Sequence, residues 1–439
     1  MNGADAVVVG AGIAGLACAT ELAKRGRDVL VLEAAARAGG PAETRRIGAY
    51  LVERGPNTVR ANSALLELIA HAGLEVVEAR RAPPAFVCDG KVVVLPPSLR
   101  ALLSGEVLPR GALLGMLAEP LRPVRRGPHT VRELVAQRLG AAAADRLADL
   151  LTLGVYGTSA DRVGFEAAFP ELAARLEGAG GRFAVLALRG MFARGGAPRA
   201  GTVSTEVGIG GLCERLGAKL GARLRTSARV QRVRARSGGF ELELDGGEKL
   251  ACRKLALAIP PAAAARVLEL PGAGALLEGY GSVPQVLASF ALEEPACALR
   301  WNTLGILAPA RERLPFIGCL IPSNLFAGRA PTGALLLSVF TASALHGASD
   351  AALARELAPA LKKLLGAARE PVLLDVARWP EGIPLYDVDH PQRTRALRER
   401  LAAEGGPTLC GVGYDGVAFA AAAASGVAAA RALGESQPV

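Results

Sequence analysis

The chain has 439 residues, of which 51% are hydrophobic, and its formal net charge of +10 comes mostly from scattered arginines. This length suggests two or three domains, and the sequence has no run of about 18 apolar residues that could span a bilayer. Aromatic residues make up only 4% of the chain and no nucleic-acid-binding motif is visible, which argues against nucleic acid as a partner.

Cysteine and histidine give no sign of a disulfide framework or of a metal site. The seven cysteines lie far apart without a Cys-x-x-Cys pair, and the four histidines show no metal-ligand spacing. The first residues also lack the pattern of a signal peptide. We therefore expect buried free cysteines in a cytoplasmic protein that binds no metal. Its positive charge leaves a peripheral contact with the cytoplasmic face of an anionic membrane as an open alternative.

The N-terminal residues predict a strand, a glycine turn, a helix and a second strand. Residues 6–9 form a fully apolar run, a stretch with helical character follows as far as Arg25, and a second apolar run at 29–32 leads to Glu33. This order of elements is the βαβ unit expected of a dinucleotide-binding site.

Three glycines, Gly10, Gly12 and Gly15, join the first strand to the helix in the pattern Gly-x-Gly-x-x-Gly. In such a site the first permits the tight turn, the second lets the backbone approach a pyrophosphate, and the third allows close packing of helix on strand. The helix start offers free N–H groups to the diphosphate, and Glu33 would accept hydrogen bonds from the adenosine ribose. The motif alone does not separate NAD from FAD.

A second glycine-rich stretch favours FAD over NAD. Two adjacent glycines soon after the acidic residue let another backbone segment cross the diphosphate, a feature of FAD proteins whose flavin extends through the domain. The predicted cofactor contacts in this part of the chain are Glu33, Ala34, Arg37, Gly39, Gly40, Gly55, Pro56 and Asn57.

The middle of the chain, residues 94–200, is rich in alanine, leucine and arginine with helical periodicity. Several prolines divide it into short helices. We interpret it as a helical cap domain, and a membrane-facing platform is the alternative.

Strand patterns return in the second half of the chain. Residues 223–261 alternate apolar and polar residues with Gly-Gly turns, and predict antiparallel strands that end in an apolar strand at 255–259. We expect this last strand to return to the dinucleotide-binding domain, with the adenine near Val230. Residues 265–390 alternate apolar strands with loops, which predicts a mixed sheet that carries the substrate cavity.

Residues 408–417 predict a strand and a glycine turn before an alanine-rich helix. The start of this helix would meet the polar edge of a flavin ring and stabilise the negative charge of its reduced form. The predicted contacts here are Gly413 and Val417.

Together these patterns predict an α/β fold with a Rossmann-like FAD-binding domain, a mixed-sheet substrate domain and a helical domain. The predicted boundaries are 1–85, 201–264 and 391–439 for the FAD-binding domain, 86–93 for a strand of the substrate domain, 94–200 for the helical domain and 265–390 for the substrate domain.

The chain resembles the FAD-dependent protoporphyrinogen oxidases of the amine oxidase and phytoene desaturase superfamily. The resemblance covers nearly the whole length and depends most on LPPSLRALLSGEVLPRG, LGVYGTSADRV, LIPSNLFAGRAP and WPEGIPLYDVDHPQR, beside the glycine motifs at both ends. It implies the removal of six electrons from a porphyrinogen in three flavin cycles, with molecular oxygen as acceptor and hydrogen peroxide formed. It also implies a role in haem biosynthesis and a homodimer. Protoporphyrinogen IX is the expected substrate, and coproporphyrinogen III is the alternative.

The resemblance also implies residues that contact the substrate, and it assigns no catalytic acid or base. Arg100 matches an arginine that binds a propionate in some members, although others place theirs where this chain has Val93. The loop at Gly157 matches one that approaches the reacting edge, but members usually have Ala-Gly where this chain has Gly157-Thr158. Phe326, with Leu304 and Leu320, would pack on the pyrrole rings.

Three residues of a later motif, Trp379, Tyr386 and His390, are expected to pack and hydrogen bond beneath the flavin, with Trp379 as a cofactor contact.

Two other functions remain open at this point. An amine oxidase of the same fold favours an aromatic cage and a lysine beside the flavin, and some carry a cysteine for covalent attachment, which is missing between Ala418 and Ala424. A catalytically silent flavoprotein that holds a tetrapyrrole would explain the unusual Val93 and Thr158.

Overall fold

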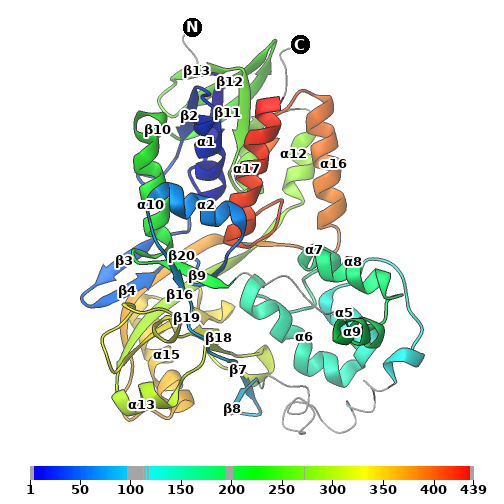
Figure 1. The fold of residues 1–439 in the computed structure, drawn as a ribbon, viewed down its shortest axis with the longest axis vertical. Helices are drawn as coiled ribbons and strands as arrows, with labels where there is room; N and C mark the ends of the chain where they lie inside the picture. The colour runs from blue at the N-terminus through cyan, green and yellow to red at the C-terminus, as the bar shows by residue number, and fades with distance from the viewer. Residues whose placement is uncertain are drawn as a thin grey trace.

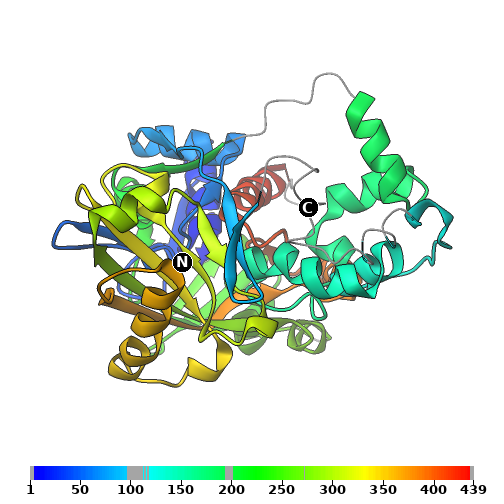
Figure 2. The same cartoon turned by 90° about the horizontal axis from the view of Figure 1, so that it is seen from below.

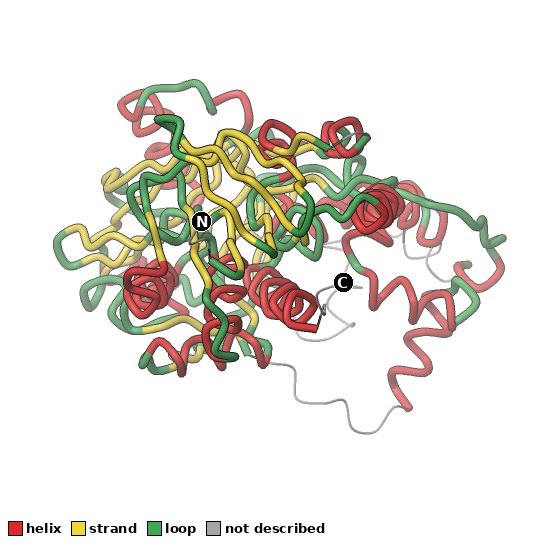
Figure 3. Tube along the Cα trace, turned by 90° about the horizontal axis from the view of Figure 1, so that it is seen from above, coloured by secondary structure: helices red, strands yellow, loops and turns green. Residues whose placement is uncertain are grey.

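The computed structural model describes residues 4–95, 118–192, 201–270 and 272–435, together with residues 112 and 115. Figure 1 shows three regions: a parallel sheet with its helices near both termini, a larger sheet below it, and a separate group of helices beside the larger sheet. Seen from below in Figure 2 and from above in Figure 3, the helical group lies to one side of the two sheets.

A parallel five-stranded sheet forms the first region and contains the predicted βαβ unit. In spatial order its strands are β10 (Leu224–Arg225), β2 (Val29–Leu32), β1 (Ala6–Val9), β14 (Lys254–Leu257) and β21 (Thr408–Leu409). The strands expected near 255–259 and after residue 408 both join it. The prediction of antiparallel strands throughout 223–261 is wrong at its start, because β10 pairs parallel with β2.

Both faces of this sheet are covered, as the apolar run of β1 requires. Ala6 and Val8 pack with the helices, whereas Val7 and Val9 face an antiparallel meander, because successive side chains of a strand point to opposite faces. The helices are α1 (Ile13–Lys24), α2 (Ser63–Ala72), α10 (Gly208–Leu220) and α17 (Phe419–Glu435). The meander side holds β11 (Val230–Arg236), β12 (Gly239–Leu244), β13 (Lys249–Cys252), β15 (Leu268–Glu269), α11 (Pro261–Val267), α12 (Ala273–Glu278) and α16 (His390–Ala403).

The larger sheet has seven strands of mixed direction: β17 pairs parallel with β7, and all other neighbouring strands in the sheet pair antiparallel. In order these are β20 (Val372–Leu385), β16 (Gly281–Glu293), β19 (Ala334–Thr341), β18 (Phe316–Leu320), β17 (Gly305–Leu307), β7 (Pro84–Cys88) and β8 (Lys91–Val94). The helices of this region are α13 (Pro295–Arg300), α14 (Pro322–Leu325) and α15 (Asp350–Leu365). The domain boundaries remain predictions, but Ala264, Leu268, Ala273 and Leu277 pack with the meander, and the next strand of the larger sheet, β16, begins only at Gly281.

Helix α15 was not predicted within 265–390, although the sequence carries its signals. Ser349 caps its start, a left-handed Gly366 ends it, and leucines recur every four residues on its buried side. Pro359 lies inside the helix, and because proline usually marks a helix end, it argues against one long helix when only the sequence is considered.

Small sheets connect the two large ones. Tyr50 and Val52 pack against Ala291 and Leu336 of the seven-stranded sheet, so the hairpin that carries them bridges both regions. These sheets consist of β3 (Thr44–Ile47) with β4 (Tyr50–Glu53), and of β5 (Val59–Arg60), β9 (Thr202–Thr205) and β6 (Val76–Glu78).

The helical group contains α5 (Val131–Leu139), α6 (Ala141–Tyr156), α7 (Phe165–Ala168), α8 (Pro170–Gly178) and α9 (Phe183–Phe192). A fully buried Arg138 pairs with Glu119, which also accepts hydrogen bonds from the backbone of Phe183 and Ala184. Of the helices in the described ranges, none has both the length and the apolar character that crossing a bilayer requires. The seven cysteines are buried, as predicted.

Candidate cofactor and substrate site

The start of α1 is built from backbone and offers an open approach. Gly12 is its N-cap, and no side chain caps the free N–H groups of the first turn. A Cβ added at Gly15 would lie closer than 3.0 Å to the carbonyl oxygen of Gly10, whereas a Cβ at Gly12 would meet nothing within 4 Å. Gly15 is therefore required by packing inside the protein, and Gly12 faces open space that a diphosphate can fill.

The second glycine pair lies beside the first motif. Gly39 forms a parallel bridge with Gly12, and its N–H donates to the carbonyl of Ala11 over 2.8 Å. The position of a Cβ on Gly40 lies 3.6 Å from the Cα of Gly12. Two glycine segments thus meet at the helix start, in the arrangement that the sequence predicts for an extended dinucleotide.

Glu33 lies at the carboxyl end of β2 and is held by backbone. Its Oε2 accepts from the N–H of Ala11 at 2.7 Å, and its Oε1 accepts from Ala35 at 2.8 Å. The carbonyl of Glu33 accepts from Ala228, which brings the start of β11 at Val230 close to this edge. The arrangement suits the adenosine end of FAD, with Ala34 exposed next to it.

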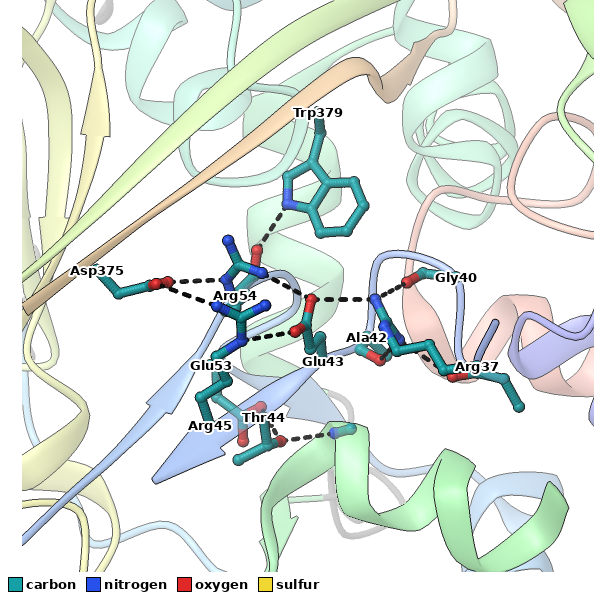
Figure 4. A network of polar contacts seen from close by, with 12 residues as sticks. Arg37, Gly40, Ala42, Glu43, Thr44, Arg45, Glu53, Arg54, Asp375 and Trp379 are labelled. Atoms are coloured by element: carbon teal, nitrogen blue, oxygen red, sulfur yellow. Dashed lines mark hydrogen bonds and ion pairs between the residues drawn. The ribbon is translucent and has the colours of Figure 1, made fainter. Parts of the chain in front are cut away.

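A network of charged side chains supports the second segment (Figure 4). Glu43 accepts from Arg37 at 3.2 Å, from Arg45 at 2.7 Å and from Arg54 at 2.9 Å. Arg54 also donates to Asp375 on β20 over 2.8 Å. Burial opposes the charge on Glu43, but the bond from Arg45 and the charges of the three arginines outweigh it, and the pKa of Glu43 is lowered.

Arg37 and Trp379, both predicted cofactor contacts, position backbone at this site. Arg37 donates to the carbonyl of Gly40 over 2.7 Å, and the indole N–H of Trp379 donates to the carbonyl of Arg54 over 2.6 Å (Figure 4). A Cβ on Gly55 would lie closer than 3.0 Å to the carbonyl of Pro41. Residues 54 and 55 are therefore fixed against the glycine loop on one side and β20 on the other.

Pro56 and Asn57 follow directly, and Asn57 ties the segment to the larger sheet. Its buried Oδ1 accepts from the hydroxyl of Ser338 on β19 over 2.9 Å, while its Nδ2 donates to the carbonyl of Gly55. At the end of β4, the buried Glu53 lies 3.6 Å from the equally buried Arg329. Burial is the largest influence on Glu53 and raises its pKa, although the arginine opposes this.

The C-terminal glycine turn is held by Tyr386 and His390, whose rings stack at 3.7 Å. The Tyr386 hydroxyl donates to the carbonyl of Val412 over 2.8 Å and accepts from the N–H of Gly416 over 2.6 Å. His390 Nε2 lies 2.9 Å from the carbonyl of Gly413. Because a carbonyl can only accept, Nε2 is the donor in this bond, and burial lowers the pKa of His390. Both side chains thus pack and hydrogen bond, as expected, and Val417 lies half-buried just after the turn.

The predicted substrate contacts have different surroundings. Leu304 and Leu320 are half-buried, and Leu320 pairs with Gly305, so the two leucines lie close together. Phe326 is only 1% exposed, and the Arg329 guanidinium lies 5.5 Å from its ring centre. Gly157 is the left-handed C-cap of α6. Arg100 lies outside the described residues.

Sequence reasoning missed Glu43, Arg54 and Asp375, which together carry the charged network. Glu43 precedes β3, Arg54 follows β4 and Asp375 lies on β20, and no local sequence spacing indicates that they meet. It also missed Gln285, a buried polar residue of β16. Over the ranges that the structure describes, no group of three or more His, Cys, Asp or Glu side chains could hold a metal ion.

Comparisons with known proteins match the chain along almost its whole length. Residues 13–434 match the family of flavin-containing amine oxidoreductases. Chloroplastic protoporphyrinogen oxidase 1 of Arabidopsis thaliana is 28% identical, and the match covers 97% of this chain and 85% of that protein. Coproporphyrinogen III oxidase of Bacillus subtilis (strain 168) is 24% identical over 94% of each chain.

A solved structure supports the fold. The protein from Exiguobacterium sp. 255-15, provisionally named a protoporphyrinogen oxidase, superposes with a TM-score of 0.83 over 98% of both chains at 24% sequence identity. Three features of the site fit a dinucleotide cofactor: the open space at Gly12, the two paired glycine segments, and the Glu33 carboxylate held by backbone N–H groups.

Proposed function

The chain belongs to the family of flavin-containing amine oxidoreductases, and from that premise we propose that it oxidises a porphyrinogen to the corresponding porphyrin. It is an FAD-dependent oxidoreductase. Relatives that act on porphyrinogens match 97% of the chain, including the larger sheet and the helical group, and this observation carries the proposal. A match confined to the dinucleotide motif would have supported only the cofactor.

In this proposal, one set of residues binds FAD and another set binds the porphyrinogen. When bound, FAD supplies a two-electron acceptor, so the six electrons of a porphyrinogen leave in three rounds. We assign the diphosphate to Gly12 and the start of α1, and the ribose to Glu33. The half-buried Leu304 and Leu320 would line an apolar wall for the macrocycle, and Arg100 would bind a propionate.

The proposed overall reaction consumes three molecules of oxygen and releases three of hydrogen peroxide for each porphyrinogen. Protoporphyrinogen IX is the first candidate substrate. Coproporphyrinogen III is the second, because relatives named for each substrate match nearly the whole chain. We further propose a cytoplasmic homodimer in haem biosynthesis, and the positive net charge favours a peripheral contact with anionic membrane.

The first test is to mix the purified, FAD-loaded protein with protoporphyrinogen IX or coproporphyrinogen III in air and to follow porphyrin fluorescence. We expect faster porphyrin formation than in an enzyme-free autoxidation control, with three molecules of peroxide per porphyrin. Anaerobic addition of the same substrate should bleach the flavin. If neither porphyrinogen reduces the flavin, the proposal is wrong, and peroxide formation with polyamines or aromatic amines would then indicate an amine oxidase.

A further inference from the structure

Gln285 carries a buried amide oxygen that has no partner. The residue lies on β16 and is 5% exposed, and within the described part of the chain its Oε1 is buried without a hydrogen bond. An unsatisfied buried polar group costs free energy, because the water that it loses is not replaced. Such a group is explained if a ligand supplies the missing donor.

The carboxamide of Gln285 lies where the end of α6 meets strand β20. A Cβ added at Gly157 would lie 2.5 Å from Nε2 of Gln285, and one added at Gly382 would lie 2.9 Å from its Cγ. Gly157 ends α6, and Gly382 lies on the neighbouring strand β20. Two glycines from different elements therefore make room for this one side chain.

The same side chain is directed toward the cofactor segment. Gln285 pairs directly with Trp379 across β16 and β20, and directly opposed residues of an antiparallel pair point to the same face. From that face the Trp379 indole reaches the carbonyl of Arg54 (Figure 4). The carboxamide thus lies next to Gly157, on the same face of the sheet as the indole that holds the predicted cofactor segment at residues 54–57.

We propose that Oε1 of Gln285 accepts a hydrogen bond from a pyrrole N–H of the bound porphyrinogen. This inference rests on the proposed function. A porphyrinogen is largely apolar, but it carries four inner N–H donors that need acceptors once water is excluded. A neutral amide accepts such a bond without the cost of burying a second charge beside a reduced flavin. Gln285 is then a residue that positions the macrocycle over the cofactor.

Gln285→Met tests this role, because methionine keeps an unbranched side chain of similar size and removes the acceptor. We expect kcat/KM for the porphyrinogen to fall about tenfold and the Kd of the porphyrin product, from fluorescence quenching, to rise by a similar factor. The ligand-free variant should melt at or above the wild-type temperature, because it no longer buries an unpaired oxygen. Gln285→Leu is a second variant with the same expectations.

A matched control is Gln137→Met on α5, where Oε1 is also buried without a partner but belongs to the helical group. It should leave kcat/KM and porphyrin binding unchanged. Wild-type values of both for Gln285→Met would overturn the inference and leave the proposed function intact. A shifted flavin reduction potential with normal porphyrin binding would overturn it too, since Gln285 would then act on the flavin. If the wild-type protein oxidises no porphyrinogen, both proposals fail.

Discussion

Two neighbouring parts of the candidate cofactor site are built in opposite ways. The start of α1 uses backbone alone, with glycines where side chains would collide or block the approach. The network around Glu43 and Arg54 uses long charged side chains from separate elements. The first part requires residues without a side chain, and the second requires the charged groups of specific side chains. Each should therefore fail in its own way when a single residue is changed.

Gly15→Ala should have the largest effect, because the new methyl group would collide with the carbonyl of Gly10. Helix α1 would have to move away from β1, and we expect a loss of at least about 3 kcal/mol of unfolding free energy, together with loss of flavin. Urea unfolding and the visible flavin absorbance measure the two effects. A yellow variant of wild-type stability would contradict the packing argument.

Gly12→Val should remove the cofactor and leave the fold intact. Its φ of −66° suits any residue, and a Cβ there meets no protein atom, so the ligand-free protein should keep its stability to within about 0.5 kcal/mol. The side chain would occupy the space assigned to the pyrophosphate. We expect a colourless protein with a wild-type circular dichroism spectrum, and normal FAD content would disprove the assignment of that space.

Arg54→Met should weaken the second part of the site. The side chain is 15% exposed and bonds to Glu43, Asp375 and the carbonyl of Val376. Its removal takes one short ion pair from each of two partly buried carboxylates, and we expect a loss of about 2–3 kcal/mol. Arg45→Met is the control, because its side chain is 49% exposed, and it should cost about 0–1 kcal/mol. Equal losses from both variants would show that the network is not what stabilises this segment.

His390 should give the smallest effect, visible only with acid. Its pKa is lowered by burial, so the unfolded chain takes up a proton below about pH 6.5 before the folded chain does. Stability should then fall with decreasing pH, by up to about 1.4 kcal/mol per pH unit, until the folded pKa is passed. His390→Gln, which does not titrate, should lack this component. Urea unfolding of both proteins near neutral pH and at mildly acidic pH would reveal identical slopes if the idea is wrong.

The same contrast explains what the sequence could predict. Gly10, Gly12, Gly15 and Glu33 follow one another in a local βαβ pattern with a known spacing, and the structure brings their segment together as expected. Arg54 follows β4 and meets Asp375 of β20 only in the folded chain, and the sequence contains no periodicity that links them. Charged residues in such networks look like ordinary surface residues until the fold is known.

Other differences have physical causes of their own. Strand β10 is too short to show a pairing direction, so its parallel partner β2 could not be foreseen. Gln285 follows Pro284 in a mostly apolar strand, and only its burial and the missing partner of its Oε1 make it notable. The substrate contacts Leu304, Leu320 and Phe326 remain predictions, and the nearly complete burial of Phe326 favours a packing role for it.

The glycine turn held by Tyr386 and His390 has a consequence for biosynthesis. It belongs to the last stretch of the parallel sheet, where β21 pairs with β14 from far earlier in the chain. As the polypeptide leaves the ribosome, β1 and α1 emerge first, but the turn that closes the other end of the site emerges only after Thr408. Pairings of such large sequence separation form slowly. We therefore expect the nascent chain to acquire FAD only after synthesis is nearly complete.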